Sequence, residues 1–111
     1  MPGATTMKPA VFHILLALSA RDLHGLGIAE AVDVATDGDV LLGPGTLYRS
    51  LKEMTRDGLI ESVPAPTGEE DPRRRFYRVT EAGRIEARGE AARMERLVEV
   101  ARANRVLPER S

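Results

Sequence analysis

The chain has 111 residues, of which 42% are hydrophobic, and it carries a net charge of −1 without any cysteine. This length supplies one small domain, which leaves little room for an enclosed catalytic cleft, and small domains often gain stability by forming oligomers. The lack of cysteine excludes disulfides, thiolate metal sites and thiol nucleophiles. The N-terminus does not resemble a signal peptide, and the apolar run 11–18 is too short to span a bilayer, so we expect a cytoplasmic protein without membrane contact.

Two helices are predicted in the first third of the chain. Pro9 favours a helix start, and the residues 10–20 that follow carry apolar side chains on nearly every face, as expected for a central helix. A second, short helix is indicated by an apolar stripe at spacings of three, four and seven that begins at Ile28. The polar residues 36–39 end this helix, and residues 40–42 are predicted as a short strand.

A third helix is predicted to begin at Pro44, which suits the first turn, and to stop at Asp57 and Gly58. Its apolar residues recur at helical spacing and form one inward row, which consists of Leu47, Leu51 and Met54. The opposite face is polar and mostly basic, and it consists of Arg49, Lys52, Glu53 and Arg56, with Thr46 and Tyr48 on its flanks.

The second half of the chain predicts a hairpin and a long helix. Residues 59–63 and 76–80 are strand-like, and the segment between them is rich in turn formers and charge, which is typical of a mobile hairpin tip. Thr80 is a suitable cap for a final helix that runs to about Arg105. The small and apolar residues of this helix repeat at alternating spacings of four and three, which is typical of helix-to-helix packing; they are Ala87, Ala91, Met94, Val98 and Ala101, with Leu97 widening the contact.

The order of these elements predicts a mainly α protein with a small β-hairpin, in the α+β class. Three helices, a hairpin and a long C-terminal helix make a winged helix-turn-helix. The expected organisation is a flexible N-terminus at 1–7, a winged-helix domain at 8–80, a dimerisation helix at 81–105 and a flexible tail at 106–111.

Five sequence blocks resemble a known family, and they cover residues 12–18, 24–28, 42–51, 57–60 and 71–83. On these blocks the chain resembles the PadR transcriptional regulators, in their short form with one C-terminal helix. It departs from the family where Leu26 replaces the usual aromatic residue and where Phe76 replaces a frequent tyrosine. Some short members line a drug-binding pore with an aromatic residue of the last helix, and this helix has none. The resemblance implies a DNA-binding regulator that represses by occlusion.

Charge placement supports double-stranded DNA as the partner, because all charged residues from 22 to 42 are acidic whereas basic residues recur from Arg49 onward. We expect the third helix to enter the major groove, where base edges present distinguishable donors and acceptors, and the wing to reach a neighbouring groove. The expected DNA-binding residues are Thr46, Tyr48, Arg49, Lys52, Arg56, Arg73, Arg74 and Arg75. In the alternative interpretations the helix has only a solvated charged face, and the wing arginines only neutralise Glu69, Glu70 and Asp71.

A single winged helix covers one half-site, so we expect a homodimer held by the last helix. The alternative is that this helix packs back on its own domain. His13 and His24 have no metal-ligand spacing, and no nucleophile is paired with a base, so we expect neither a metal, nor a cofactor, nor an enzyme. A small-molecule effector site between the dimer helices stays open, with no residues assigned to it. The alternative function is a winged-helix module that binds another protein.

Overall fold

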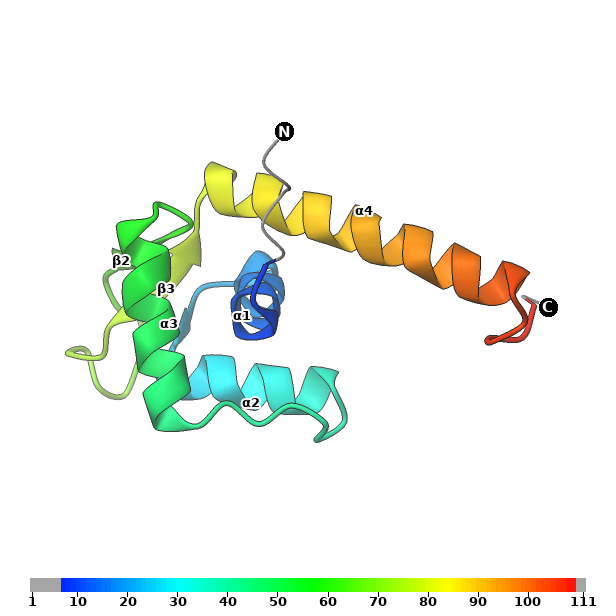
Figure 1. The fold of residues 1–111 in the computed structure, drawn as a ribbon. Coiled ribbons are helices and arrows are strands. Elements are labelled where there is room, and N and C mark those ends of the chain that lie inside the picture. Colours follow the sequence, from blue (N-terminus) through cyan, green and yellow to red (C-terminus); the bar gives the residue numbers. More distant parts are fainter. Residues whose placement is uncertain (1–6, 110–111) are drawn as a thin grey trace.

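The computed structural model describes residues 7–109. Within this part of the chain the elements are α1 (Pro9–Ala20), β1 (Leu23–His24), α2 (Gly25–Ala35), α3 (Pro44–Arg56), β2 (Ile60–Val63), β3 (Phe76–Val79) and α4 (Glu81–Ala103). The arrangement is a bundle of short helices with a small sheet on one side and a long helix across the top (Figure 1). The predicted α+β winged helix is confirmed. Of the expected flexible ends, residues 1–6 and 110–111 lie outside the described residues.

Helix α1 is the centre of the domain, as its apolar sequence predicts. It contacts α2, α3, α4 and β3, and Ile14 and Leu15 are completely buried. Leu16 is the exception among its large apolar side chains, because 47% of its surface is exposed. The central position of α1 means that the other elements are held in place largely through their contacts with it.

The start of α2 is set by a histidine cap. His24 Nδ1 accepts a hydrogen bond of 3.1 Å from the backbone N–H of Gly27, which satisfies one of the free donors in the first turn. This cap fixes where α2 begins, four residues before the apolar stripe that the sequence showed. On the inner side of α2, Ile28 and Val32 are buried against the core.

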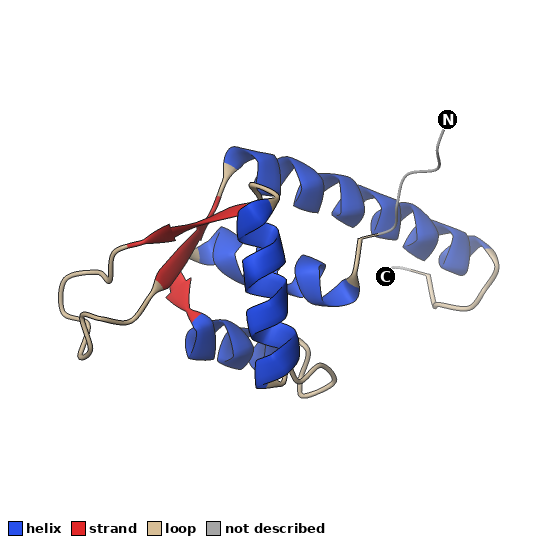
Figure 2. Ribbon diagram, turned by 60° about the vertical axis from the view of Figure 1, so that its left-hand side comes forward, coloured by secondary structure: helices blue, strands red, loops and turns tan. Residues whose placement is uncertain are grey.

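The sheet has three strands in the order β1-β3-β2, and all neighbours are antiparallel (Figure 2). The hairpin strands β2 and β3 pair Ile60 with Val79, as the two predicted strands require. The third strand, β1, was not predicted, and it pairs Leu23 with Tyr77 on the other edge of β3. A two-residue strand has no alternation pattern in the sequence, so only the neighbouring edge of β3 defines it.

The predicted strand at 40–42 is wrong. These residues have no regular structure in the connection between α2 and α3. The N–H of Val40 donates instead to the Thr36 hydroxyl at 3.0 Å, and Leu42 is packed against the core. The apolar residues at this place therefore mark partial burial, and they pair with no strand of the sheet.

Helix α4 begins at the cap that the sequence predicts, because Thr80 Oγ1 accepts a 3.0 Å hydrogen bond from the N–H of Gly83. It ends at Ala103, two residues before the predicted end, and Arg105 adopts a left-handed φ of 62°. Its first half lies against the domain, and its second half extends beyond it (Figure 1), which gives the molecule a long dimension of 51 Å.

A half-buried ion pair lies where α4 leaves the domain. Glu90 is only 9% exposed, and Arg93 donates to its two carboxylate oxygens at 2.6 and 3.1 Å. These hydrogen bonds hold the pKa of Glu90 below its ordinary value, because they favour the charged form. The pair allows a carboxylate to be buried on the inner face of α4.

Candidate nucleic-acid interface

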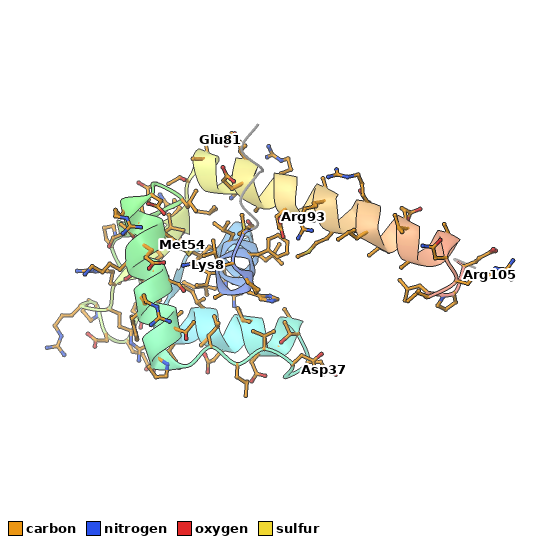
Figure 3. All side chains as sticks on the ribbon, viewed as in Figure 1. Lys8, Asp37, Met54, Glu81, Arg93 and Arg105 are labelled. Carbon is orange, nitrogen blue, oxygen red and sulfur yellow. The ribbon has the colours of Figure 1, made fainter. Side chains whose placement is uncertain are left out.

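Helix α3 presents a basic face to solvent because its apolar residues all turn inward. Leu47, Leu51 and Met54 are buried, and Met54 lies on the side of α3 that faces α1 (Figure 3). Ser50 is also buried, although its position on this helix was not predicted to be internal. The predicted contact residues of α3 are all exposed; they are Thr46, Tyr48, Arg49, Lys52 and Arg56.

The charges on this face are not equally free. Glu53 is 3.6 Å from Lys8, and the guanidinium of Arg56 is 3.2 Å from the carboxylate of Asp57. Arg49 and Lys52 have no ion-pair partner among residues 7–109. Since a cation without a protein partner keeps its charge available for a ligand, Arg49 and Lys52 dominate the potential of the outer face of α3.

The aromatic residue of this face is held by a glycine. Gly25, the first residue of α2, is buried, and a Cβ atom at this position would lie 2.9 Å from the hydroxyl oxygen of Tyr48. The Tyr48 side chain is nevertheless 57% exposed. The missing side chain of Gly25 thus lets Tyr48 pack across the junction of α2 and α3 while much of its surface stays exposed.

The three arginines of the wing differ in their surroundings. Arg73 is 3.3 Å from Asp71, and Arg74 is 3.3 Å from Glu69. Both ion pairs agree with the alternative interpretation, in which the wing arginines neutralise acidic residues of the same loop. Arg75 is exposed and forms no ion pair within the described residues.

Two hollows separate α3 from the wing, and Tyr48, Arg75 and Tyr77 line both of them. The larger has a volume of about 410 Å³. Its wall contains Lys52 from α3 and Ser62 from β2. The structure therefore brings Lys52 and Arg75, which are far apart in the sequence, to one basic hollow with hydroxyl groups around it.

Sequence reasoning did not identify Ser62 and Tyr77 as part of this site. Their signal in the sequence is weak, because strand alternation says which residues share a face and not which helix lies opposite. The smaller hollow adds His24, whose Nε2 is 3.1 Å from a guanidinium nitrogen of Arg74. The wing thus contacts the start of α2 as well as lying beside α3.

An ion pair joins the wing to the segment before β1. Arg78 of β3 donates to the two carboxylate oxygens of Asp22 at 2.7 and 3.2 Å. This contact raises the pKa of Arg78, so its charge is committed to holding β1 beside the hairpin. The acidic residue Asp37 lies just beyond the C-terminal end of α2, at the opposite end of this helix from the wing (Figure 3).

The predicted seam of α4 divides into two parts. Ala87 is buried in the core of its own domain. At this position the helix therefore packs back on its own domain, as the alternative interpretation expected. Beyond it the residues are exposed or half-buried, and they are Ala91, Met94, Leu97, Val98 and Ala101. The outer half of α4 therefore carries an apolar row for which the described part of the same chain supplies little cover.

No group of three or more His, Asp or Glu side chains within residues 7–109 is arranged to hold a metal ion. In the same range, no helix combines the length and the apolar character that a membrane crossing needs.

Three helices, a hairpin wing and an exposed basic face on α3 define a winged-helix DNA-binding protein. The sequence model of the transcriptional regulator PadR-like family matches residues 14–89. The chain belongs to this family, which confirms the resemblance found in the sequence. Because the family consists of transcriptional regulators, the prediction that the chain is not an enzyme is also confirmed.

Solved structures share the fold. A PadR family regulator from hypervirulent Clostridium difficile is similar with a TM-score of 0.73 and 24% identity, over 86% of this chain and 97% of that one. The PcaV regulator from Streptomyces coelicolor, in complex with its natural ligand, has a TM-score of 0.71 and 24% identity. The likeness covers 91% of this chain and 64% of PcaV. Bacillus subtilis PadR, in complex with operator DNA, has a TM-score of 0.63 and 21% identity. The likeness covers 74% of this chain and 46% of that protein. No curated protein sequence matches the chain significantly.

Proposed function

We propose that this DNA-binding regulator is a repressor that binds a palindromic operator as a homodimer and is released by a small-molecule effector. The observation that carries the proposal is the pair of cations on the exposed face of α3, Arg49 and Lys52, which have no ion-pair partner among residues 7–109. Helix α3 inserts into the major groove, where Arg49 and Lys52 contact bases or phosphates. Thr46 and Tyr48 contact phosphate or thymine methyl groups, and Arg56 contacts the backbone.

The wing supplies the second contact. Arg75 is the wing residue best prepared for it, because it needs no ion pair to be broken and shares a hollow with Lys52. Arg73 and Arg74 contribute after exchanging their carboxylate partners for phosphates. A complex of Bacillus subtilis PadR with operator DNA exists for a protein of this fold, which supports DNA as the partner.

The test is direct binding of labelled duplex from the region upstream of the protein's own gene. We expect a shifted complex whose affinity falls steeply as salt rises, since phosphate contacts release counterions. Random duplex should bind more weakly at the same salt concentration. Failure to bind either duplex in dilute buffer would contradict the proposal and favour a module that docks on another protein.

The homodimer is proposed from the outer half of α4. Met94, Leu97, Val98 and Ala101 continue the helix face that carries Ala87 and Glu90, because steps of three and four residues return to the same side of a helix. Near the domain this face is covered by α1, and farther out it is not (Figure 1). A second copy covers the exposed part and sets two α3 helices about one DNA turn, roughly 34 Å, apart.

Leu97→Glu is expected to convert the dimer to a monomer at micromolar concentration, because it places a charge in the apolar contact. Sedimentation velocity measures this change. The control is Ala92→Glu, which adds the same charge at an exposed position on the opposite face of α4. A wild-type protein that sediments as a monomer, or a Leu97→Glu variant that stays dimeric, would contradict the predicted seam.

The effector is proposed because the family resemblance implies a regulated repressor. PcaV, which shares the fold, was solved in complex with its natural ligand. This likeness supports the existence of an effector for this chain.

A further inference from the structure

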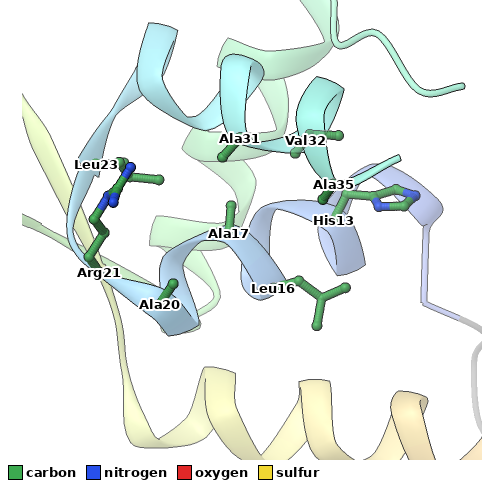
Figure 4. Close-up of a pocket in the computed structure, with 9 residues that line it drawn as sticks. All are labelled: His13, Leu16, Ala17, Ala20, Arg21, Leu23, Ala31, Val32 and Ala35. Atoms are coloured by element: carbon green, nitrogen blue, oxygen red, sulfur yellow. The ribbon is translucent and has the colours of Figure 1, made fainter. Parts of the chain in front are cut away.

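Two hollows of different character adjoin the short strand β1. Leu23 lines an apolar groove between α1 and α2 (Figure 4). Successive side chains of a strand point to opposite faces, so His24 turns to the other side, where it lines the smaller hollow between α3 and the wing. This hollow has a volume of about 170 Å³, which is below the range of drug-sized ligands and suits an ion-sized group.

The ring of His24 is held in one orientation by two contacts. It lies nearly perpendicular to the ring of Phe76, with centroids 5.2 Å apart. Its Nδ1 accepts the 3.1 Å hydrogen bond from the N–H of Gly27 that caps α2. A neutral imidazole has one nitrogen that accepts and one that donates, so the cap leaves the proton on Nε2. His24 therefore presents an N–H donor to the hollow.

Arg74 places a second donor beside the first. One of its guanidinium nitrogens is 3.1 Å from Nε2 of His24, and the single accepting nitrogen of the ring cannot serve both Gly27 and Arg74. The N–H of Gly27 is fixed in the first turn of α2, whereas Arg74 has another acceptor in Glu69, at 3.3 Å. Two donors therefore lie side by side in the hollow, and one acceptor between them would satisfy both.

We propose that these two donors bind one phosphate oxygen of the operator backbone, which makes His24 a DNA-contact residue at the start of α2. A phosphate oxygen is a strong acceptor for such a pair. Arg75 and Tyr48 line the same hollow, and they add a positive charge and a hydroxyl group. In the free protein the carboxylate of Glu69 stands in for the phosphate on Arg74, and DNA displaces it. The inference rests on the proposed DNA-binding function and adds a residue and its ligand group to it.

The position of the ring proton can be measured without DNA. Long-range ¹H–¹⁵N NMR spectra distinguish the two neutral forms of a histidine ring, and we expect the proton of His24 on Nε2. A proton on Nδ1 would mean that Arg74 takes the accepting nitrogen, and it would overturn the proposal. Inorganic phosphate serves as a probe of the hollow, and it should shift the ring signals of His24 and the amide signal of Gly25 saturably.

Two replacements of His24 separate the contact from the cap. Asparagine keeps an oxygen that can cap α2 but is too short to place a donor in the hollow. Glutamine places an amide N–H near the position of Nε2 and lacks the short cap. His24→Asn should weaken operator binding about three- to tenfold, the loss expected for one half-exposed hydrogen bond to a charged group, and His24→Gln should recover most of it.

Thermal melting of the same two variants shows whether His24 acts only in folding. Because asparagine is a preferred cap, His24→Asn should be more stable than His24→Gln, although it binds the operator more weakly. A role in folding alone would move stability and affinity together. That result would overturn the proposal.

The phosphate itself is located by replacing the phosphates of the bound duplex one at a time with neutral methylphosphonate. At one position we expect the replacement to cost His24→Asn less affinity than it costs the wild type, because the variant has already lost part of the contact. Equal costs in the two proteins at every position would overturn the proposal.

Glu69→Gln tests the displaced carboxylate. It should strengthen operator binding about two- to fivefold, because Arg74 no longer has an exposed ion pair to give up. The control is Glu70→Gln, which removes the same charge from the neighbouring exposed position. Equal strengthening by both variants would mean that only the net charge of the wing matters, and it would contradict the exchange at Arg74.

The outcomes separate the site from the proposed function. Saturable phosphate shifts in a protein that binds no DNA would refute the proposed function and retain the site. DNA binding without coupling between His24 and any phosphate would do the reverse, and a protein that responds to neither phosphate nor DNA would refute both.

Discussion

Replacing both Arg49 and Lys52 by alanine should weaken operator binding about 100-fold or more, because each side chain supplies a contact worth at least about tenfold in affinity. These two residues are the exposed cations of α3 without an ion-pair partner among the described residues. Arg56, by comparison, already pairs with Asp57, so its replacement should have a smaller effect. Electrophoretic mobility shift at several salt concentrations measures the affinity and its salt dependence.

The salt dependence assigns the kind of contact. Loss of a phosphate contact should reduce the slope of log affinity against log salt by about one, whereas loss of a base contact should relax specificity at one position. The matched control is the double replacement of Arg88 and Arg96 by alanine, which removes two exposed charges from α4. Equal weakening by both double variants would mean that net charge alone attracts DNA. Unchanged affinity of the α3 variant would refute α3 as the helix that reads the operator.

Gly83→Ala should lower the free energy of unfolding by about 3 kcal/mol, near the upper end of what an overfilled core costs. Gly83 is buried in the first turn of α4, and its missing side chain leaves space for the backbone carbonyl of Leu59 and a methyl group of Val79. That carbonyl cannot move freely, since it accepts a 3.0 Å hydrogen bond from the N–H of Thr80. An added methyl group must therefore separate α4 from the hairpin.

The control for this change is on the same helix. Gly89 has open space where a Cβ would lie, so Gly89→Ala should stabilise the protein by up to about 1 kcal/mol through helix propensity. Chemical denaturation of the two variants measures the difference at constant protein concentration, which holds any dimer contribution fixed. A Gly83→Ala variant as stable as Gly89→Ala would show that α4 does not depend on its close approach to Leu59.

Local periodicity was enough to find α3 and its exposed basic face. The apolar row of α3 repeats at helical spacing, so the polar residues between its members, including Arg49 and Lys52, must face away from the core. The cap residue Thr80 was equally visible, because a cap depends on a bond to a backbone group only three residues ahead.

The full set of residues that form the site was harder to predict from the sequence than the position of α3. Whether a wing arginine is free or paired depends on how the loop folds, and the three consecutive arginines differ in this respect. The hollow that joins Lys52 to Arg75 also depends on how the hairpin lies beside α3. Neither feature has a repeating pattern along the chain, so neither could be read from it.

The sequence by itself determined the order of the four helices and the hairpin, the fold class and the exposed basic face, because each of these follows from interactions between residues a few positions apart. Only the tertiary structure decided that Leu23 and His24 form a strand, that residues 40–42 do not, and that Ala87 belongs to the domain core. The same holds for the groove between α1 and α2, which exists because two separate helices meet. Such contacts join distant parts of the chain, and a residue's partner across that distance is set by the packing of the whole domain rather than by its neighbours in the sequence.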